Sequence, residues 1–304
     1  MEVSCKSLPM NQNGYALPMV MAISMIIMIM TLSIAFSMRH KIAVISELKD
    51  QSLARLKSYS AMNETIYNIL TSDFTQTGIK IYLPDGAWKS WNLYNEPIAL
   101  DDTTNVRLQD VAGLVSPVTQ ASDFANLIHG TFGMTPDVNS FIDKLADWQD
   151  TDDLKHLNGA EAWDYKAAGY PYVPRNYYIQ TLDEMHLIMG VDSSMLDAIR
   201  NDITYWGADH INYLTMSANM LHVMLGDDRT VAAVLKMRSE HALTGNYFSG
   251  LTGIPRSDMV MFAPSALIRI RVTARLNKAV DRIEAVIAKR ETQTLPYMVL
   301  EWNH

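Results

Sequence analysis

The feature that most constrains this chain is an apolar run near its beginning. From Tyr15 to Met38 the sequence contains no charged side chain. At about 1.5 Å rise per residue, a helix of this length crosses a hydrocarbon core roughly 30 Å thick. Lipid offers the backbone no hydrogen-bond partner, so a single segment that spans it must be helical. The run therefore predicts a single-pass membrane anchor.

Two other interpretations of this run are a cleaved secretory signal and an uncleaved signal anchor. A cleaved secretory signal has a shorter apolar region that ends at small residues, and no such cleavage pattern ends this run. An uncleaved signal anchor has the same length and composition. Lys6 and Glu2 offset each other before the run. Arg39 and Lys41 follow it, so charge bias does not favour an orientation with the N-terminus in the cytoplasm.

Composition limits the partners and the chemistry. The 304 residues leave room for one large or two small domains after the anchor. A net charge of −8 argues against a nucleic-acid surface, which needs clustered Lys and Arg. The single cysteine, Cys5, precedes the apolar run, so the rest of the chain has no thiol, which suits an oxidising periplasm. The sequence contains no metalloprotease, nucleophile-elbow or P-loop motif, which favours a structural protein over an enzyme.

Beyond the apolar run, helical spacing continues to about residue 70. Apolar side chains recur mostly every three or four positions, and no Gly or Pro interrupts the pattern before Gly78. A helix from residue 15 to residue 70 is roughly 80 Å long. Its outer half is amphipathic, so we expect its apolar stripe to pack on a globular body.

Later segments alternate between strand and helix patterns. From Lys80 onward, short strand patterns are bounded by turn residues, and residues 121–240 return to helical spacing. After Gly253, residues 266–276 alternate apolar side chains with arginines, as is typical of an antiparallel strand with one solvated face. Residues 280–290 fit either a strand or a helix.

The order helix, strands, helices, strands predicts an α+β fold. We expect the long N-terminal helix to pack on an antiparallel sheet, with a large α-helical domain inserted into that body. The expected divisions are a leader at 1–14, a transmembrane and amphipathic helix at 15–71, the first part of the α+β domain at 72–120, an inserted α-helical domain at 121–245 and a C-terminal β part at 246–304.

The densest group of candidate ligands is acidic. Asp147, Asp150, Asp152 and Asp153 lie within seven residues, and Glu161 follows. These carboxylates repel one another unless a cation or basic side chains neutralise them. Hard oxygen ligands without a His or Cys motif favour calcium over zinc or iron.

The spacing of these residues leaves several interpretations open. Asp150, Asp152 and Glu161 fall at positions one, three and twelve of an EF-hand loop, but Leu154 occupies a ligand position and a lysine replaces the glycine. A solvated loop between two helices explains the same run. His156 is interpreted as a surface neighbour of the loop. Paired carboxylates also act as acid and base in some hydrolases, although carboxylates this close in sequence more readily share one cation.

The beginning of the chain resembles the type IV prepilin family. A short polar leader ends at Gly14, and the apolar helix starts at once at Tyr15. The resemblance implies that a prepilin peptidase cuts between these two residues and methylates the new N-terminal amine. Family members usually carry Glu at the fifth mature position, which is Met19 here. This departure is typical of the K-type minor pseudopilin of the type II secretion system.

The acidic region is also similar to the K-type pseudopilins. Residues 147–165, the phrase Pro174-Arg175-Asn176 and residues 179–185 follow one another at the distances of that family. Family members bind calcium in this region. A further phrase at 210–218 retains only the first of two family asparagines, as Asn212. The resemblance implies these calcium ligands: Asp147, Asp150, Asp152, Asp153, Glu161, Asn176 and Glu184.

The resemblance also implies a fold, a place and a set of partners. It implies a pilin-like, non-enzymatic minor pseudopilin in the bacterial inner membrane, with its body in the periplasm and a place at the tip of the pseudopilus. The expected partners are the I-type and J-type minor pseudopilins, the major pseudopilin, the prepilin peptidase and the inner-membrane secretion platform. Two alternatives stay open: a minor pilin of a type IV pilus-like system, and a membrane-anchored periplasmic calcium-dependent enzyme.

Overall fold

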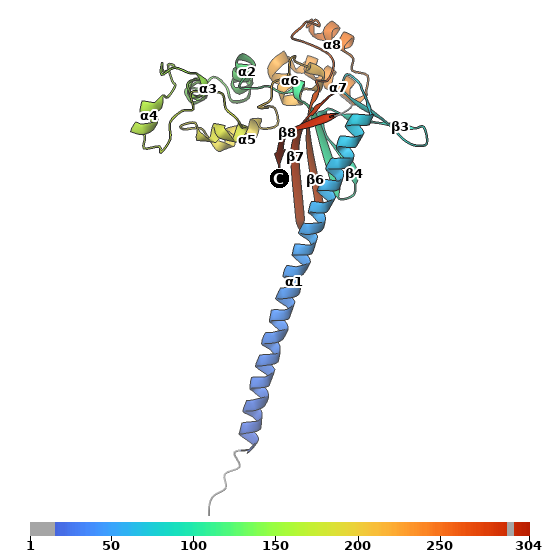
Figure 1. Ribbon diagram of the computed structural model, residues 1–304, viewed down its shortest axis with the longest axis vertical. Coiled ribbons are helices and arrows are strands. Elements are labelled where there is room, and N and C mark those ends of the chain that lie inside the picture. The colour runs from blue at the N-terminus through green and yellow to red at the C-terminus, as the bar shows by residue number, and fades with distance from the viewer. Residues whose placement is uncertain (1–15, 291–294) are drawn as a thin grey trace, which may run out of the picture.

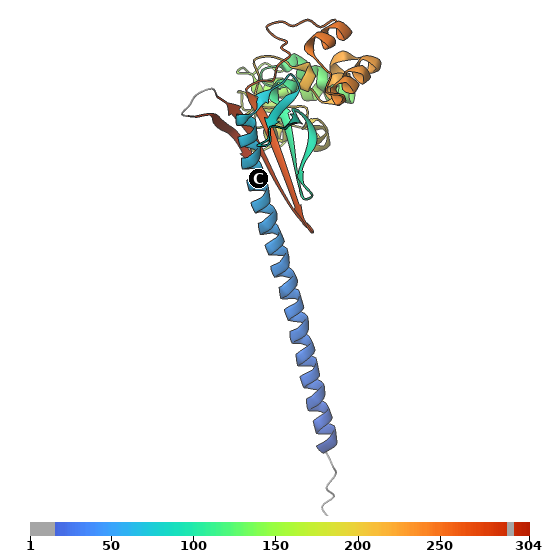
Figure 2. The same ribbon diagram turned by 90° about the vertical axis from the view of Figure 1, so that its right-hand side faces the viewer.

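The longest element of the protein is helix α1, Ala16–Thr71. The computed structural model describes residues 16–290 and 295–304, so Cys5 and the predicted processing site at Gly14 and Tyr15 lie outside the described residues. Pro18 lies in the first turn of α1, where its missing N–H breaks no helical hydrogen bond. Figures 1 and 2 show α1 as a long stalk with the rest of the chain gathered at its far end.

The two halves of α1 have different surroundings. The most apolar segment of its first half has a mean hydropathy of 2.5, and no residue of that segment is buried. Among the described helices, α1 alone is long and apolar enough to cross a membrane. In the outer half, Ala54, Met62, Ile66 and Ile69 are buried. The helix is therefore solvent-exposed or lipid-exposed at its start and packed against the body at its end.

Among the described residues, eight strands form two antiparallel sheets. The smaller sheet has the order β1-β2-β3, and the larger has the order β4-β5-β6-β7-β8. Residues 280–290, which fitted a strand or a helix, fall mostly in strand β7, so the helical alternative is wrong. The strands are β1 (Asp73–Phe74), β2 (Gly78–Tyr82), β3 (Trp88–Asn92), β4 (Tyr94–Asp101), β5 (Thr104–Asp110), β6 (Leu267–Leu276), β7 (Ala279–Lys289) and β8 (Tyr297–Asn303).

One face of the larger sheet packs on α1. Met62 and Ile69 of the helix form a single core with Ile270 of β6 and with Ile283 and Ile287 of β7. Strand β6 alternates as expected, with every second side chain directed into this core. The long helix α1 therefore packs on the antiparallel sheet, as the sequence predicts.

The opposite face of β6 is not fully solvated, which corrects the sequence expectation. Arg269 is only 3% exposed. Its Nη2 donates to the carbonyl of Ile203 at 2.6 Å, and its Nε lies 3.6 Å from a carboxylate oxygen of Glu284. Burial is the main reason that the pKa of Arg269 is lowered to about 10. Alternation along a strand distinguishes two faces, but it does not show that a distant segment covers the second one.

The chain between β5 and β6 forms a predominantly helical region, residues 111–266. Strands β5 and β6 pair directly although this whole region separates them in sequence. In Figure 1 the region extends sideways from the end of the sheet that lies farthest from the start of α1. Its elements are η1 (Val111–Gly113), α2 (Ala121–Phe132), α3 (Pro136–Gln149), α4 (Ala162–Ala167), η2 (Leu182–Leu187), α5 (Ser193–Ile199), η3 (Tyr213–Thr215), α6 (Ala218–Leu225), α7 (Asp228–Ser239) and α8 (Gly245–Thr252).

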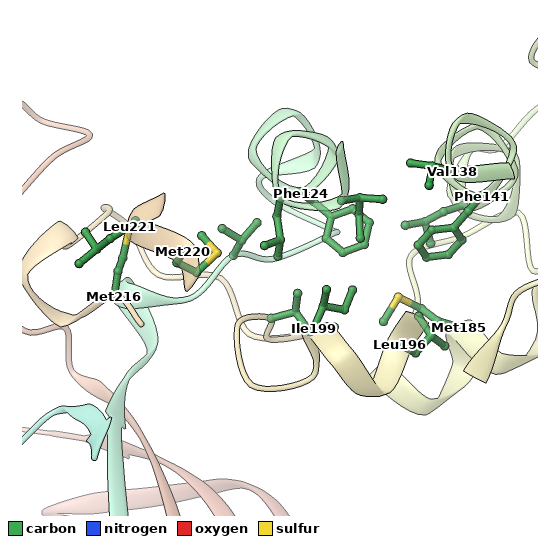
Figure 3. Packing of buried hydrophobic residues seen from close by; sticks show 14 of the residues in the cluster. Phe124, Val138, Phe141, Met185, Leu196, Ile199, Met216, Met220 and Leu221 are labelled. Atoms are coloured by element: carbon green, nitrogen blue, oxygen red, sulfur yellow. The ribbon is translucent and has the colours of Figure 1, made fainter. Parts of the chain in front are cut away.

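The helical region has its own hydrophobic core, separate from the core beneath α1. Figure 3 shows Phe124 of α2 and Phe141 of α3 packed above Met185 of η2 and above Leu196 and Ile199 of α5. The two phenylalanine rings meet edge to face, with centroids 6.1 Å apart. Short helices like these are stable only when such packing supplements their local propensity.

A buried carboxylate joins the helical region to the sheet. Asp110, at the end of β5, is fully buried. Its oxygens accept hydrogen bonds from Ala112 N at 3.1 Å, Asn212 Nδ2 at 3.1 Å, Thr215 Oγ1 at 2.9 Å, and the backbone N and Oγ of Ser265 at 2.9 and 2.7 Å. Ala112 lies at the start of the helical region and Ser265 at its end, and the other two donors lie within it. Asp110 therefore holds its entry and its exit together.

Candidate functional site

The acidic cluster lies between α3 and α4. Thr135 caps α3, because its side chain accepts a hydrogen bond from Val138 N at 3.3 Å. Asp147 lies in the last turn of α3, and Asp150 follows as its C-cap residue. Carboxylates at this end face the negative end of the helix dipole, which disfavours their charge. The position of the cluster therefore favours a cation.

Three side chains of the cluster converge. Asp147, Asp150 and His156 each offer a ligand atom, and these atoms lie within 4.8 Å of one another. The backbone N of His156 donates to Asp147 Oδ1 at 3.0 Å, and the His156 ring Nδ1 contacts the same oxygen. His156 was interpreted as a surface neighbour. Its side chain is 48% exposed, yet it is also a direct partner of the buried Asp147.

Buried carboxylate oxygens without partners mark the same place. Asp147 Oδ2, Asp150 Oδ1 and both side-chain oxygens of Glu161 are buried and lack a hydrogen bond from any described residue. Burial, and then the charges of Asp147 and Asp150, raise the pKa of Glu161 to about 7. Burial, and then Asp152, also raise the pKa of Asp150. Unsatisfied buried charge of this kind is strongly unfavourable unless a cation binds it.

Glycine at position 159 makes this arrangement sterically feasible. A Cβ built on Gly159 would overlap with Asp147 Oδ2. The loop backbone therefore passes directly against the carboxylate, and every other residue type would displace it. Gly159 is a functional residue that the acidic pattern does not predict, because a glycine offers no ligand atom. In the sequence it is marked only by its position between the Asp-rich run and Glu161.

Asp152, Asp153 and Asn176 lie together beside this cluster. Asn176 Nδ2 is 3.4 Å from the carbonyl oxygen of Asp152 and 3.4 Å from Asp153 Oδ1. Asn176 adopts a positive φ of 52°, a conformation that Asn tolerates better than most residues. The structure therefore brings Asn176 to the acidic loop across a long stretch of sequence.

Glu184 belongs to a different network. It is 7% exposed, and it accepts hydrogen bonds from Trp148 Nε1 at 2.9 Å, from Gln180 N at 3.0 Å and from Arg175 Nε. Burial raises its pKa, but the bonds from Arg175 and the other donors outweigh this effect, so the pKa of Glu184 is lowered overall. Both carboxylate oxygens thus have protein donors. Glu184 fixes the segment around Arg175 against α3.

The donor set suits a hard divalent cation. Asp147, Asp150 and Glu161 each have a buried oxygen without a described hydrogen-bond partner, and the charges of the two aspartates act on Glu161. Calcium takes six to eight oxygens in flexible geometry. Backbone oxygens and water complete such sites in many proteins. A bound cation would join the end of α3 to the start of α4 and neutralise three neighbouring carboxylates.

Comparisons with known proteins found a family match and a similar solved structure. Residues 112–208 match the family model described as type II secretion system (T2SS), protein K. This segment contains the whole acidic cluster. The chain is also similar to one in the crystal structure of the GspK-GspI-GspJ complex from the enterotoxigenic Escherichia coli type 2 secretion system. That likeness has 14% sequence identity and a TM-score of 0.53, and it covers 84% of this chain and 97% of that chain.

No curated protein matches the chain. At 14% identity the structural likeness shows the fold, which is α+β with a long N-terminal helix on an antiparallel sheet and an inserted helical region. The family match covers the first part of the helical region, up to residue 208, and this part includes the acidic loop. Residues 112–208 are therefore similar to type II secretion system protein K, and the chain has a fold like that of one chain in the GspK-GspI-GspJ complex.

Proposed function

We propose that this protein caps or initiates the periplasmic pseudopilus at its tip. The observation that carries the proposal is the position of the helical region, which overhangs the end of the body farthest from the start of α1 (Figure 1). A further subunit stacked on that end would meet the helical region. A subunit of this shape suits the end of a filament, where nothing is stacked above it.

The residue at position 19 also supports a position at the tip of the pseudopilus. Met19 lies in the apolar half of α1, where its side chain is exposed. In pilin-like filaments a glutamate at this position is thought to pair with the N-terminal amine of a neighbouring subunit. A tip subunit has no neighbour above it, and an unpaired acid inside a membrane is costly. Methionine avoids that penalty.

We further propose the partners and the maturation of the chain. The E. coli chain of similar fold was crystallised as a complex named GspK-GspI-GspJ. The corresponding I-type and J-type minor pseudopilins, the major pseudopilin and the inner-membrane secretion platform are the proposed partners here. A prepilin peptidase is proposed to cut between Gly14 and Tyr15, leaving the body in the periplasm on a single inner-membrane helix.

Mass spectrometry of the protein purified from its own membranes tests the maturation. A methylated Tyr15 at the mature N-terminus is the expected result, and an intact Met1 would contradict it. Affinity purification of the full chain tests the assembly. Recovery of the I-type and J-type pseudopilins is expected, whereas recovery of type IV pilus proteins would favour the pilus-like alternative.

Calcium is the proposed ligand of the acidic cluster. Asp147, Asp150 and Glu161 would bind it directly, because Asp147 Oδ2, Asp150 Oδ1 and both side-chain oxygens of Glu161 are buried without a hydrogen-bond partner among the described residues. Asp152, Asp153 and Asn176 lie beside them and would complete the loop, while Glu184 is engaged with Arg175. The role of the cation is structural. Calcium-dependent hydrolysis of peptide, ester or glycoside substrates by the purified protein would contradict that role.

A further inference from the structure

A pocket of about 920 Å³ lies where the helical region meets the sheets. One wall is the segment around Gln76, which connects β1 to β2. The first turn of α8, with Asn246, forms a second wall. Residues 262–266 and Lys289, the last residue of β7, close the remaining sides. The volume is within the range typical of ligand sites.

The walls of this pocket are held in place by hydrogen bonds. Gln76 Oε1 accepts from Gly245 N at 2.9 Å, and Lys289 N donates to the carbonyl of Ala266 at 2.8 Å. A Cβ on Gly245 would overlap with the ring of Phe262, so α8 begins directly on that ring. The pocket is therefore formed before any ligand binds, which lowers the entropic penalty of binding.

The pocket is positive in an acidic protein. Arg256 and Lys289 both line it, and none of the described residues that line it is acidic. Neither cation forms an ion pair with another described residue. Lys289 Nζ instead lies 4.3 Å from the ring centroid of Phe74. The chain as a whole carries a net charge of −8, so these unpaired cations reverse its charge locally.

The other lining residues suit a polypeptide. Phe74 and Phe262 provide apolar surface, and the amide side chains of Gln76 and Asn246 offer donors and acceptors to a peptide backbone. We propose that this pocket binds an extended, acidic segment of a partner protein, whose carboxylates pair with Arg256 and Lys289. This proposal depends neither on calcium binding by the acidic loop nor on a position of the protein at the filament tip.

The geometry excludes membrane lipid as the source of the negative charge. The apolar run ends at Met38, and α1 ends at Thr71, three residues before Phe74 of the pocket. The helix between these points is about 50 Å long at its usual rise. The pocket therefore lies far from any phospholipid headgroup of the membrane that α1 enters.

Fluorescence anisotropy on the full chain in nanodiscs of zwitterionic lipid tests this site. The probe is a short fluorescent peptide rich in glutamate, compared with the same peptide carrying glutamine at those positions. The glutamate peptide is expected to bind, and R256Q and K289Q are each expected to weaken it on the order of tenfold. R229Q, which removes an exposed arginine from α7, is the matched control and should leave binding unchanged.

A second variant separates the pocket from general charge attraction. Ser249→Trp fills the pocket from α8 while leaving Arg256 and Lys289 in place, so it should abolish binding. Circular dichroism checks that each variant keeps the wild-type fold. Equal affinity for the two peptides, or unchanged binding by S249W, would overturn the proposal. Full displacement of the peptide by inorganic phosphate at low concentration would show a small-anion site and would also overturn it.

Discussion

At the scale of single residues, the buried carboxylates of the acidic loop are the proposed ligands of calcium. Calcium is expected to raise the midpoint of thermal unfolding of the full chain. At a free calcium concentration a hundredfold above Kd, a single site stabilises by about 2.7 kcal/mol. Glu161→Gln should lose this shift, because it removes one charge and one of the unpaired oxygens.

The matched control for that measurement is Asp137→Asn. Asp137 is exposed in the first turn of α3, on the same helix as Asp147 but away from the cluster. Its variant should keep the full calcium shift. The absence of any calcium effect on the wild-type protein would refute the metal site.

The same carboxylates predict that the folding stability depends on pH when a chelator removes calcium. The pKa of Glu161 rises from its ordinary 4.5 to about 7 on folding. Between these values the folded state binds a proton that the unfolded chain has released, so stability falls as pH rises. Raised pKa values of Asp150 and His156 act in the same direction. The expected loss between about pH 5 and pH 7.5 is up to about 3 kcal/mol.

Saturating calcium should abolish most of this loss, since the cation then compensates the ionised carboxylates. Thermal unfolding, followed by circular dichroism at a series of pH values, measures stability against pH once with chelator and once with calcium. Stability that rises with pH over this range in chelator would contradict the raised pKa of Glu161.

Gly159 is the residue whose substitution should affect the site most directly. Gly159→Ala places a methyl group onto Asp147 Oδ2, so the loop or the carboxylate must move. The expected result is loss of the calcium shift, with destabilisation of about 1 to 3 kcal/mol. Gly250→Ala in α8, where a Cβ meets nothing within 4 Å, is the control and should be neutral or slightly stabilising. A normal calcium response in the Gly159 variant would count against the site.

At the scale of elements, the junction between the sheet and the helical region depends on Asp110. Its carboxylate accepts hydrogen bonds from Ala112 at the start of that region, from Asn212 within it and from Ser265 at its end. Asp110→Asn replaces one acceptor oxygen with a donor group that opposes the surrounding donors. We expect destabilisation of about 2 to 4 kcal/mol, measured by thermal unfolding. Asp102→Asn in the exposed β4–β5 turn should change stability by less than about 0.5 kcal/mol.

The elements also show which parts of the fold were predictable. Strand β6 and helix α1 were predicted because their side-chain periods are local properties of the sequence. The period could not show that Arg269 would be covered, because the covering carbonyl of Ile203 lies far away in sequence. The ambiguity of β7 had the same origin, since its pairing with β6 and β8 decides its conformation.

At the scale of the whole molecule, the anchor and the overhanging helical region together suggest a subunit at the end of a filament (Figure 1). Met19→Glu is expected to slow membrane insertion or to reduce the yield of the complex with the I-type and J-type pseudopilins. The physical reason is the free energy of an unpaired carboxyl group within the membrane. Met19→Leu keeps the position apolar and serves as the control. Unchanged secretion and unchanged complex yield in the glutamate variant would contradict this reasoning.

The sequence by itself determined the local properties of this protein. The uncharged run predicted the membrane helix, the change of period predicted an α+β fold, and the spacing of acidic residues predicted a candidate cation site. These follow from the chain geometry of neighbouring residues and from resemblance to a known family.

Only the tertiary structure decided which groups meet. In the folded protein, β5 pairs with β6 across the helical region, and Glu184 accepts a hydrogen bond from Arg175. His156 and Gly159 lie against Asp147. The tertiary structure also assembled the positive pocket from five separate segments. The physical reason is that burial, pKa shifts and unpaired oxygens arise from contacts between residues distant in sequence, which no local pattern contains.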